Sequence, residues 1–144
     1  MKETFDKLLE IIKNRIEKEI KWSDDMLYAV LCAYNKWQED ERDGVDYIFN
    51  IDNNKDLECC VRGGMSATDI AWLVDKFKSC HSNYFLFGNN HQTPEPFASK
   101  EELVKYISYS IADFLPYVFF EPSAYTELYD LLMYDFVFRN YIDQ

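Results

Sequence analysis

The chain has 144 residues, of which 48% are hydrophobic and 17% aromatic, with four glycines and four prolines. This composition excludes an intrinsically disordered or collagen-like chain, because such chains lack the apolar area that offsets conformational entropy. The 26 acidic residues outnumber the 15 basic ones, giving a net charge of -11. That balance argues against direct binding of DNA or RNA, since contact with phosphates needs a basic surface. The length suits a single globular domain over residues 1–144.

The N-terminal segment carries a charge every two or three residues, so it lacks the apolar stretch of a signal peptide. The longest apolar run, residues 26–34, is much shorter than the about 20 residues that span a membrane. We therefore expect a cytoplasmic protein with no membrane partner. Its four cysteines are expected to be thiols; they are Cys32, Cys59, Cys60 and Cys80.

Residues 3–21 repeat apolar side chains at helical spacing, which predicts an amphipathic helix. Ser23 is a typical N-cap residue, and the pattern after it predicts a second helix that ends near residue 42. The short break between the two helices predicts an N-terminal helical hairpin.

Val45, Tyr47, Phe49 and Ile51 occupy every second position of residues 45–51, which predicts a short strand. Residues 57–62 are compatible with one helical turn or with a returning strand, because periodicity does not decide over so few positions. Ser66 and Asp69 have the spacing of a capping box, which favours a helix over 67–79.

The aromatic run over 84–87 predicts another strand, and residues 88–98 have the composition of a loop-like linker. A second capping-box pattern precedes a helix that should end at Pro116, and a last helix is expected over 123–142. The fold class is therefore mainly α (α+β), with about five helices and two or three short strands. The expected helix starts are Glu3, Asp24, Ala67, Lys100 and Ser123.

The last predicted helix is apolar on most of its sides. One stripe is expected to lie in the core and consists of Tyr125, Leu128, Leu132 and Phe136. A helix that is apolar all round is either central to a core or shared with a partner. The candidate partner-binding residues are therefore those on its other faces, namely Glu127, Asp130, Tyr134, Phe138 and Tyr141.

No pattern assigns a metal, a cofactor or a catalytic group. Potential metal ligands occur as adjacent pairs, and adjacent side chains diverge on a helix and on a strand. The segment from Asp52 to Asp56 imitates the start of a calcium loop, but Leu57 and Gly63 occupy the places of the required Gly and Glu. Gly63 and Gly64 are expected to end a helix rather than to hold a phosphate.

The segments WSDDMLYAVL, GVDYIFNID and CCVRGGMSATDIAWL resemble parts of small uncharacterised acidic bacterial proteins from accessory and mobile-element genes. This resemblance implies no activity and supplies no site residues.

We interpret the chain as a non-enzymatic, acidic protein-binding module whose Tyr- and carboxylate-rich C-terminal surface contacts another protein, either a basic one or a second copy. One alternative is a nucleic-acid mimic that inhibits a DNA-binding protein. Another is an enzyme with a site near Cys80, His81 and His91.

Overall fold

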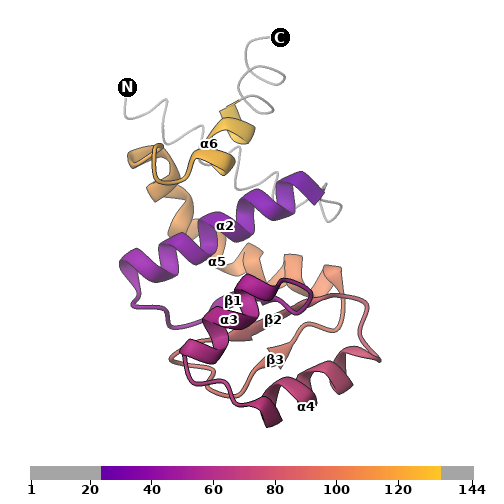
Figure 1. Ribbon diagram of the computed structural model, residues 1–144. Coiled ribbons are helices and arrows are strands. Elements are labelled where there is room, and N and C mark those ends of the chain that lie inside the picture. The colour runs from indigo at the N-terminus through magenta and orange to yellow at the C-terminus, as the bar shows by residue number, and fades with distance from the viewer. Residues whose placement is uncertain (1–23, 134–144) are drawn as a thin grey trace. The chain divides into compact units, whose positions relative to one another are not determined.

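The computed structural model describes residues 24–133 (Figure 1). Its elements, in chain order, are α2 (Asp24–Glu41), β1 (Tyr47–Asn50), α3 (Asn54–Arg62), α4 (Ala67–Phe77), β2 (Tyr84–Phe87), β3 (Glu95–Pro96), α5 (Lys100–Phe120) and α6 (Thr126–Leu132). The fold is mainly α with a small three-stranded antiparallel sheet, as the sequence predicted. The helix expected over 3–21, and with it the N-terminal hairpin, lies outside the described residues.

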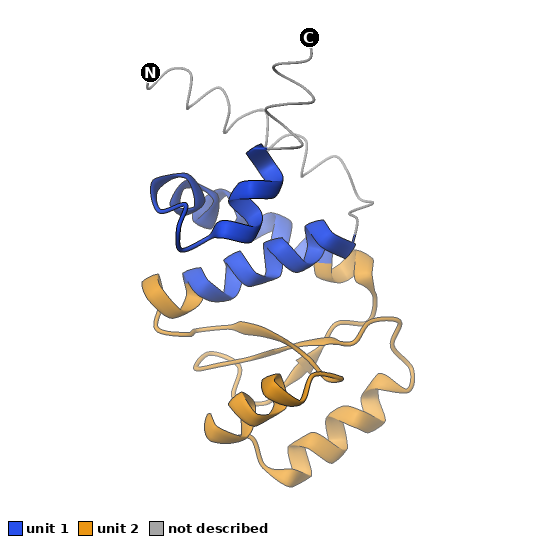
Figure 2. Cartoon of the chain, turned by 45° about the horizontal axis from the view of Figure 1, so that its top comes forward, with its two compact units in different colours: residues 1–37, 104–144 blue, residues 38–103 orange. Residues whose placement is uncertain are grey.

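The chain divides into two compact units, coloured separately in Figure 2. Unit 2 is the continuous segment 38–103, which holds the sheet with α3 and α4. Unit 1 consists of residues 1–37 and 104–144, of which the structure describes 24–37 and 104–133. Both divisions fall inside helices, since α2 and α5 continue from one unit into the other. The single domain expected over 1–144 stays a prediction.

The sheet of unit 2 has the strand order β1-β2-β3, and each neighbouring pair is antiparallel. Phe49 lies opposite Phe85, and their rings are 6.0 Å apart. Because side chains alternate along a strand, this face also carries Tyr47 and Phe87, and the other carries Ile48, Leu86 and Tyr84. The aromatic face belongs to the core of unit 2, whose buried members are Cys60, Met65, Leu73, Phe85 and Phe87.

The free edge of β1 is occupied by side chains. In an antiparallel pair the backbone groups of alternate residues point away from the neighbouring strand. The N–H of Asp46 donates to Gln38 Oε1 at 3.1 Å, and that of Asn50 donates to Asp56 Oδ2 at 2.8 Å. These two bonds use donors that an added strand would need.

The opposite edge, along β3, is blocked by a different device. Phe97 N–H donates to the carbonyl of Tyr84 at 2.9 Å, so the backbone nitrogens of residues 94 and 96 point away from β2. Both residues are prolines and have no N–H to offer. The sheet therefore offers few backbone donors to a further strand.

Unit 1 is built from the first turns of α2 with most of α5 and α6. The Tyr34 ring lies 6.0 Å from the rings of both Trp37 and Phe114, and its hydroxyl is 3.2 Å from that of Tyr106. The remaining buried side chains of α5 follow one helical stripe and include Ile107, Ile111, Leu115 and Val118.

The helix α5 does not end at Pro116, as the sequence predicted, but continues to Phe120. Proline removes one backbone hydrogen bond and typically costs about 3 kcal/mol inside a helix. Burial of Val118 and the edge contact between Phe119 and Tyr129, with rings 6.1 Å apart, are the interactions that offset this cost. Residues 117–120 are therefore helical because of packing rather than local preference.

The segment 88–98 is also more ordered than a linker. It contains β3 and the buried residues Pro94 and Phe97. None of the helices over residues 24–133 is both long enough and apolar enough to cross a bilayer.

Candidate functional site

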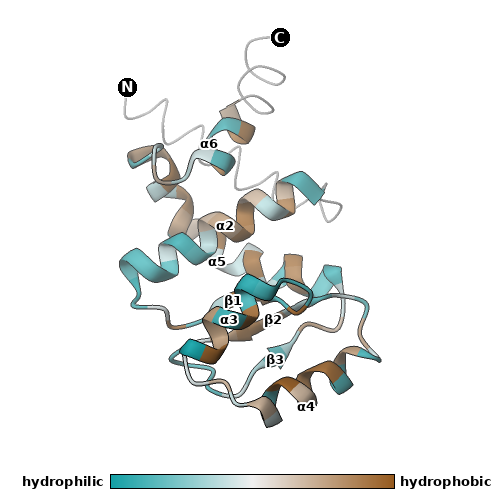
Figure 3. Cartoon of the chain, in the orientation of Figure 1, coloured by the Kyte–Doolittle hydropathy of each residue, from teal (hydrophilic) through white to brown (hydrophobic). Residues whose placement is uncertain are grey.

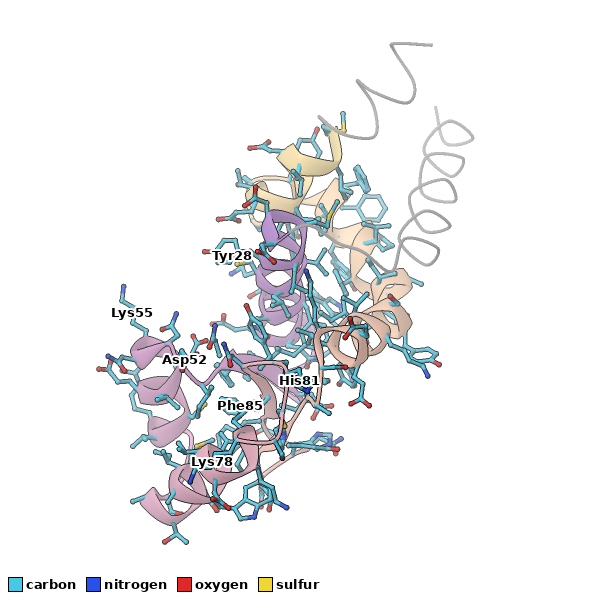
Figure 4. All side chains as sticks on the ribbon, turned by 90° about the vertical axis from the view of Figure 1, so that its right-hand side faces the viewer. Tyr28, Asp52, Lys55, Lys78, His81 and Phe85 are labelled. Carbon is cyan, nitrogen blue, oxygen red and sulfur yellow. The ribbon has the colours of Figure 1, made fainter. Side chains whose placement is uncertain are left out.

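The described part of unit 1 carries exposed aromatic side chains on its surface. Tyr28 on α2 is 63% exposed, and on α5 Tyr109 is 76% and Phe120 69% exposed. Tyr28 points away from its helix in Figure 4. Large aromatic groups are usually mostly buried, so three of them at this exposure mark surface suited to contact.

The helix α6 separates its apolar and acidic sides as the sequence predicted. Tyr125, Leu128 and Leu132 are buried, whereas Glu127 and Asp130 are exposed. This separation follows from the three- and four-residue spacing of the apolar positions, which places them on one helical face. The two carboxylates therefore face solvent in the unit that carries the exposed aromatic residues.

Four other predicted residues of this region fall on the part of the chain that the structure does not describe. They are Tyr134, Phe136, Phe138 and Tyr141. The described part of the predicted core stripe is buried, and its extension to Phe136 stays a prediction.

A group of carboxylates lies at the end of α2, where the ribbon is strongly hydrophilic (Figure 3). Burial raises the pKa of the nearby Tyr47 hydroxyl, and the negative charges of Glu39, Asp40 and Asp43 raise it further. The shift shows that these acids create a negative field close to the start of the sheet. The helix dipole does not stabilise negative charge at this end.

The imidazole of His91 connects the loop after β2 to the segment before β1. Its Nδ1 contacts Asp46 Oδ1, and its Nε2 lies 3.2 Å from Glu95 Oε2. A neutral imidazole can donate to only one of these carboxylates, whereas an imidazolium donates to both. Since Asp46 is buried, this contact compensates a charge that would otherwise be removed from water without a partner.

Backbone hydrogen bonds hold the same two segments together. Asn89 N–H donates to the Gly44 carbonyl at 3.0 Å, and Asn90 N–H donates to the Val45 carbonyl at 2.7 Å. Gly88 allows this approach, because a Cβ there would lie 2.7 Å from the Val45 oxygen. The His91 contacts therefore belong to a structural connection rather than to an open pocket.

The enzyme alternative named three residues, and each has different partners in the structure. The Cys80 thiol lies 3.5 Å from the Lys76 carbonyl, and the backbone of His81 forms an isolated parallel β-bridge with Ser99. The imidazole of His91 contacts Asp46 and Glu95 instead. No hydrogen bond or ion pair joins Cys80, His81 and His91 to one another.

The four cysteines form no disulfide, and the two adjacent ones on α3 differ in their exposure to solvent. Cys60 is fully buried, which raises its pKa to about 12, with smaller contributions from Asp56 and Cys59. A thiol with so high a pKa is not a nucleophile at neutral pH. Cys59 is exposed, and its sulfur accepts a hydrogen bond from Arg62 Nη2 at 3.3 Å.

The remaining sequence patterns have structural roles. The Asn53 side chain caps α3 by accepting from the N–H groups of Lys55 and Asp56, and Gly63 closes that helix. Residues 57–62 are thus helical, which periodicity had left open. Ser66 and Asp69 form the predicted reciprocal capping box. Across residues 24–133, no group of three or more His, Cys, Asp and Glu side chains is arranged to hold a metal ion.

Sequence reasoning missed Tyr28, Tyr109 and Phe120 as surface groups. A signal was present for Tyr109, since it lies opposite the apolar stripe of its predicted helix. The pairing of Asp46 with His91 had no such signal, because the two residues are distant in sequence.

Comparisons with protein-family models, with curated proteins and with solved structures gave no match. The candidate site therefore depends on the geometry of this chain alone.

Proposed function

We propose that the chain is a non-enzymatic, cytoplasmic protein-binding module, and that its C-terminal acidic surface contacts a basic region of another protein. The observation that carries the proposal is the pair of exposed carboxylates Glu127 and Asp130 in a unit whose large aromatic side chains are also exposed. By sequence, the proposed surface extends to Tyr134, Phe138 and Tyr141.

This combination of groups suits protein recognition. Tyrosine and phenylalanine offer a large contact area with few rotatable bonds, and the tyrosine hydroxyl adds one hydrogen-bonding group. Carboxylates attract a basic partner and favour one orientation of the encounter. The net charge of -11 also attracts a basic partner at longer range.

The mode of binding is expected to use helix surfaces. Strand addition needs a row of free backbone donors and acceptors at a sheet edge. Gln38 and Asp56 already accept from the outer edge of β1, and Pro94 and Pro96 interrupt the outer edge of β3.

The test is capture of partners from a lysate of the native host, followed by measurement of binding with the purified partner. The double variant Glu127→Lys/Asp130→Lys should weaken binding of a basic partner by about tenfold or more, since it replaces attraction with repulsion. Asp52→Lys/Glu58→Lys is the matched control, because it makes the same charge change at exposed residues of unit 2.

The control should leave affinity within about twofold at physiological salt, because Asp52 and Glu58 do not belong to the proposed surface and salt screens their general contribution. Equal weakening by both variants would show that only the overall charge matters. Unchanged binding in both would exclude the acidic side of α6 as the contact surface.

Mimicry of a nucleic acid is a second candidate function, favoured by the carboxylates that surround Tyr47. Glu39, Asp40 and Asp43 together are close enough to raise the pKa of its hydroxyl. In this case the captured partner would be a DNA-binding protein, and duplex DNA would compete with the chain for it. Glu39→Lys/Asp40→Lys would then weaken the complex more than the change on α6 does.

A further inference from the structure

The exposed side of α5 in unit 1 carries an ordered ridge of three residues. Lys105, Tyr109 and Asp113 are spaced by four, so they lie in one row along the helix. All three are exposed. The opposite side of α5 holds the buried residues Ile107, Ile111, Phe114 and Val118.

Tyr109 is the most exposed large apolar side chain among the described residues, at 76%. Beside it on the helix surface lie the small Ala112 on one side and the half-buried Tyr106 on the other. An exposed ring that protrudes from a helix in this way can pack into the groove of another helix. Neither Lys105 nor Asp113 forms an ion pair with any residue of 24–133.

We propose that a second copy of the chain covers this ridge, with the two α5 helices antiparallel and a two-fold axis passing at Tyr109. Such an axis places Lys105 of one copy opposite Asp113 of the other, and the reverse pair forms at the same time. The two tyrosines meet at the centre. This proposal does not depend on the proposed function, because it requires no other protein and neither of the carboxylates of α6.

The order of charges selects this occupant. The three-residue ridge is positive at Lys105, apolar at Tyr109 and negative at Asp113, so it is complementary to itself when reversed. Glu101 continues the same row one turn before Lys105 and would lie opposite residue 117 of the second copy, away from both charge pairs. A partner of uniform charge would be attracted by one end of the ridge and repelled by the other.

The charges also select the register. Packing Tyr109 against Phe120 of the second copy would move the axis to a point between Phe114 and Leu115. Asp113 would then lie close to the same residue of the other copy, and like charges placed opposite each other are destabilising. The register centred at Tyr109 avoids this contact.

The test uses the purified full chain alone, in sedimentation equilibrium at about 0.15 M salt, where the repulsion between two acidic copies is screened beyond roughly 8 Å. Wild type should show a reversible monomer–dimer equilibrium. Lys105→Glu and Asp113→Lys should each weaken it by at least about tenfold, because each places two like-charged pairs across the interface.

The double variant Lys105→Glu/Asp113→Lys should restore dimerisation, since it exchanges the charges without changing their complementarity. The two single variants should also associate with each other when mixed, although neither associates with itself. In that mixed pair both contacts join opposite charges. These rescue results depend on the proposed register and do not follow from a change in folding.

Tyr109→Ala should abolish dimerisation with little change in the melting temperature, because the ring is exposed in the monomer. Tyr28→Ala is the matched control, an exposed tyrosine on α2 of the same unit, and should leave the equilibrium unchanged. The proposal would be overturned if the chain stayed monomeric at every concentration up to about 1 mM. Such a result would mean that the free energy of dimerisation is weaker than about 4 kcal/mol. A dimer that neither charge reversal weakens would also overturn the proposal.

Discussion

Phe114 and Phe85 occupy comparable places in the two units, since each is fully buried and each contacts other aromatic rings. Their surroundings differ. Around Phe114 the chain is helical, so the backbone satisfies its own hydrogen bonds. Around Phe85 the strands are short, and the connections between the elements contain backbone N–H and C=O groups that need hydrogen-bond partners outside a helix or strand.

Unit 2 solves this problem with specific polar contacts. Gln38, Asp46 and His91 tie the ends of α2, β1 and the loop after β2 to one another. Unit 1 relies mainly on apolar packing at helical spacing. The comparison indicates that unit 1 should tolerate polar surface changes, whereas unit 2 should depend on individual hydrogen bonds and on small residues at close approaches.

The largest effects are expected from Phe114→Ala and Phe85→Ala. Each should lower the free energy of unfolding by about 3–5 kcal/mol, because each removes a fully buried ring. We expect one cooperative transition in calorimetry for both, since α2 and α5 run through the boundary between the units. Two resolved transitions, with each variant shifting only one, would show that the units unfold separately.

Gly88→Ala should destabilise the protein by about 1–3 kcal/mol, since the new Cβ would meet backbone rather than a movable side chain. It would lie 2.7 Å from the Val45 oxygen and 2.8 Å from the Gly44 oxygen. Gly63→Ala is the control, because its Cβ would have no neighbour nearer than 3.4 Å. Chemical denaturation should find the control near wild type, and equal losses would contradict the close approach.

The contact between Asp46 and His91 can be measured by a double-mutant cycle with Asp46→Asn and His91→Gln. Each single change should cost about 1–2 kcal/mol, because His91→Gln leaves the buried Asp46 without its charged partner and Asp46→Asn leaves His91 with Glu95 alone. The coupling energy should fall in the range of about 0.5–3 kcal/mol for residues in direct contact. Additive single effects would mean that His91 does not support Asp46.

The smallest effect at neutral pH concerns Cys60. Its folded-state pKa of about 12 is raised from the ordinary value of 9.0, so the thiol stabilises the fold at neutral pH and this contribution is lost as pH rises through that interval. Stability of wild type should therefore fall more steeply above pH 9 than that of Cys60→Ala. At pH 8 an alkylating reagent should label exposed Cys59 and spare Cys60, as peptide mass spectrometry can show.

The sequence predicted the elements whose signals are local. The helix α4 with its capping box and the aromatic strand β2 were found at the expected positions. The first predicted residue of α2, α4 and α5 agrees with the structure, and α6 begins at Thr126 rather than Ser123. Local spacing and caps were sufficient at these places because they agree with the packing.

The sequence-based predictions were wrong where contacts with residues distant in sequence determine the secondary structure. Pro116 signals a helix end, yet packing of Val118 keeps α5 helical. Residues 88–98 have loop composition, but β2 supplies a pairing partner that makes β3. For the site, the buried side of α6 followed from periodicity, whereas the exposure of Tyr28 and Phe120 depends on neighbours that no local pattern identifies.

The way in which the chain divides also has a consequence for synthesis. Unit 2 is continuous in sequence, whereas unit 1 combines the beginning and the end of the chain. A ribosome adds roughly 5–20 residues per second, so the 38–103 segment takes about 3–13 s to make. During that time the apolar side of α2, with Leu27, Val30 and Tyr34, cannot pack against α5, because α5 has not yet been synthesised. We expect a nascent chain to expose this apolar side to solvent during the interval, and a permuted chain that joins the two parts of unit 1 would remove the delay.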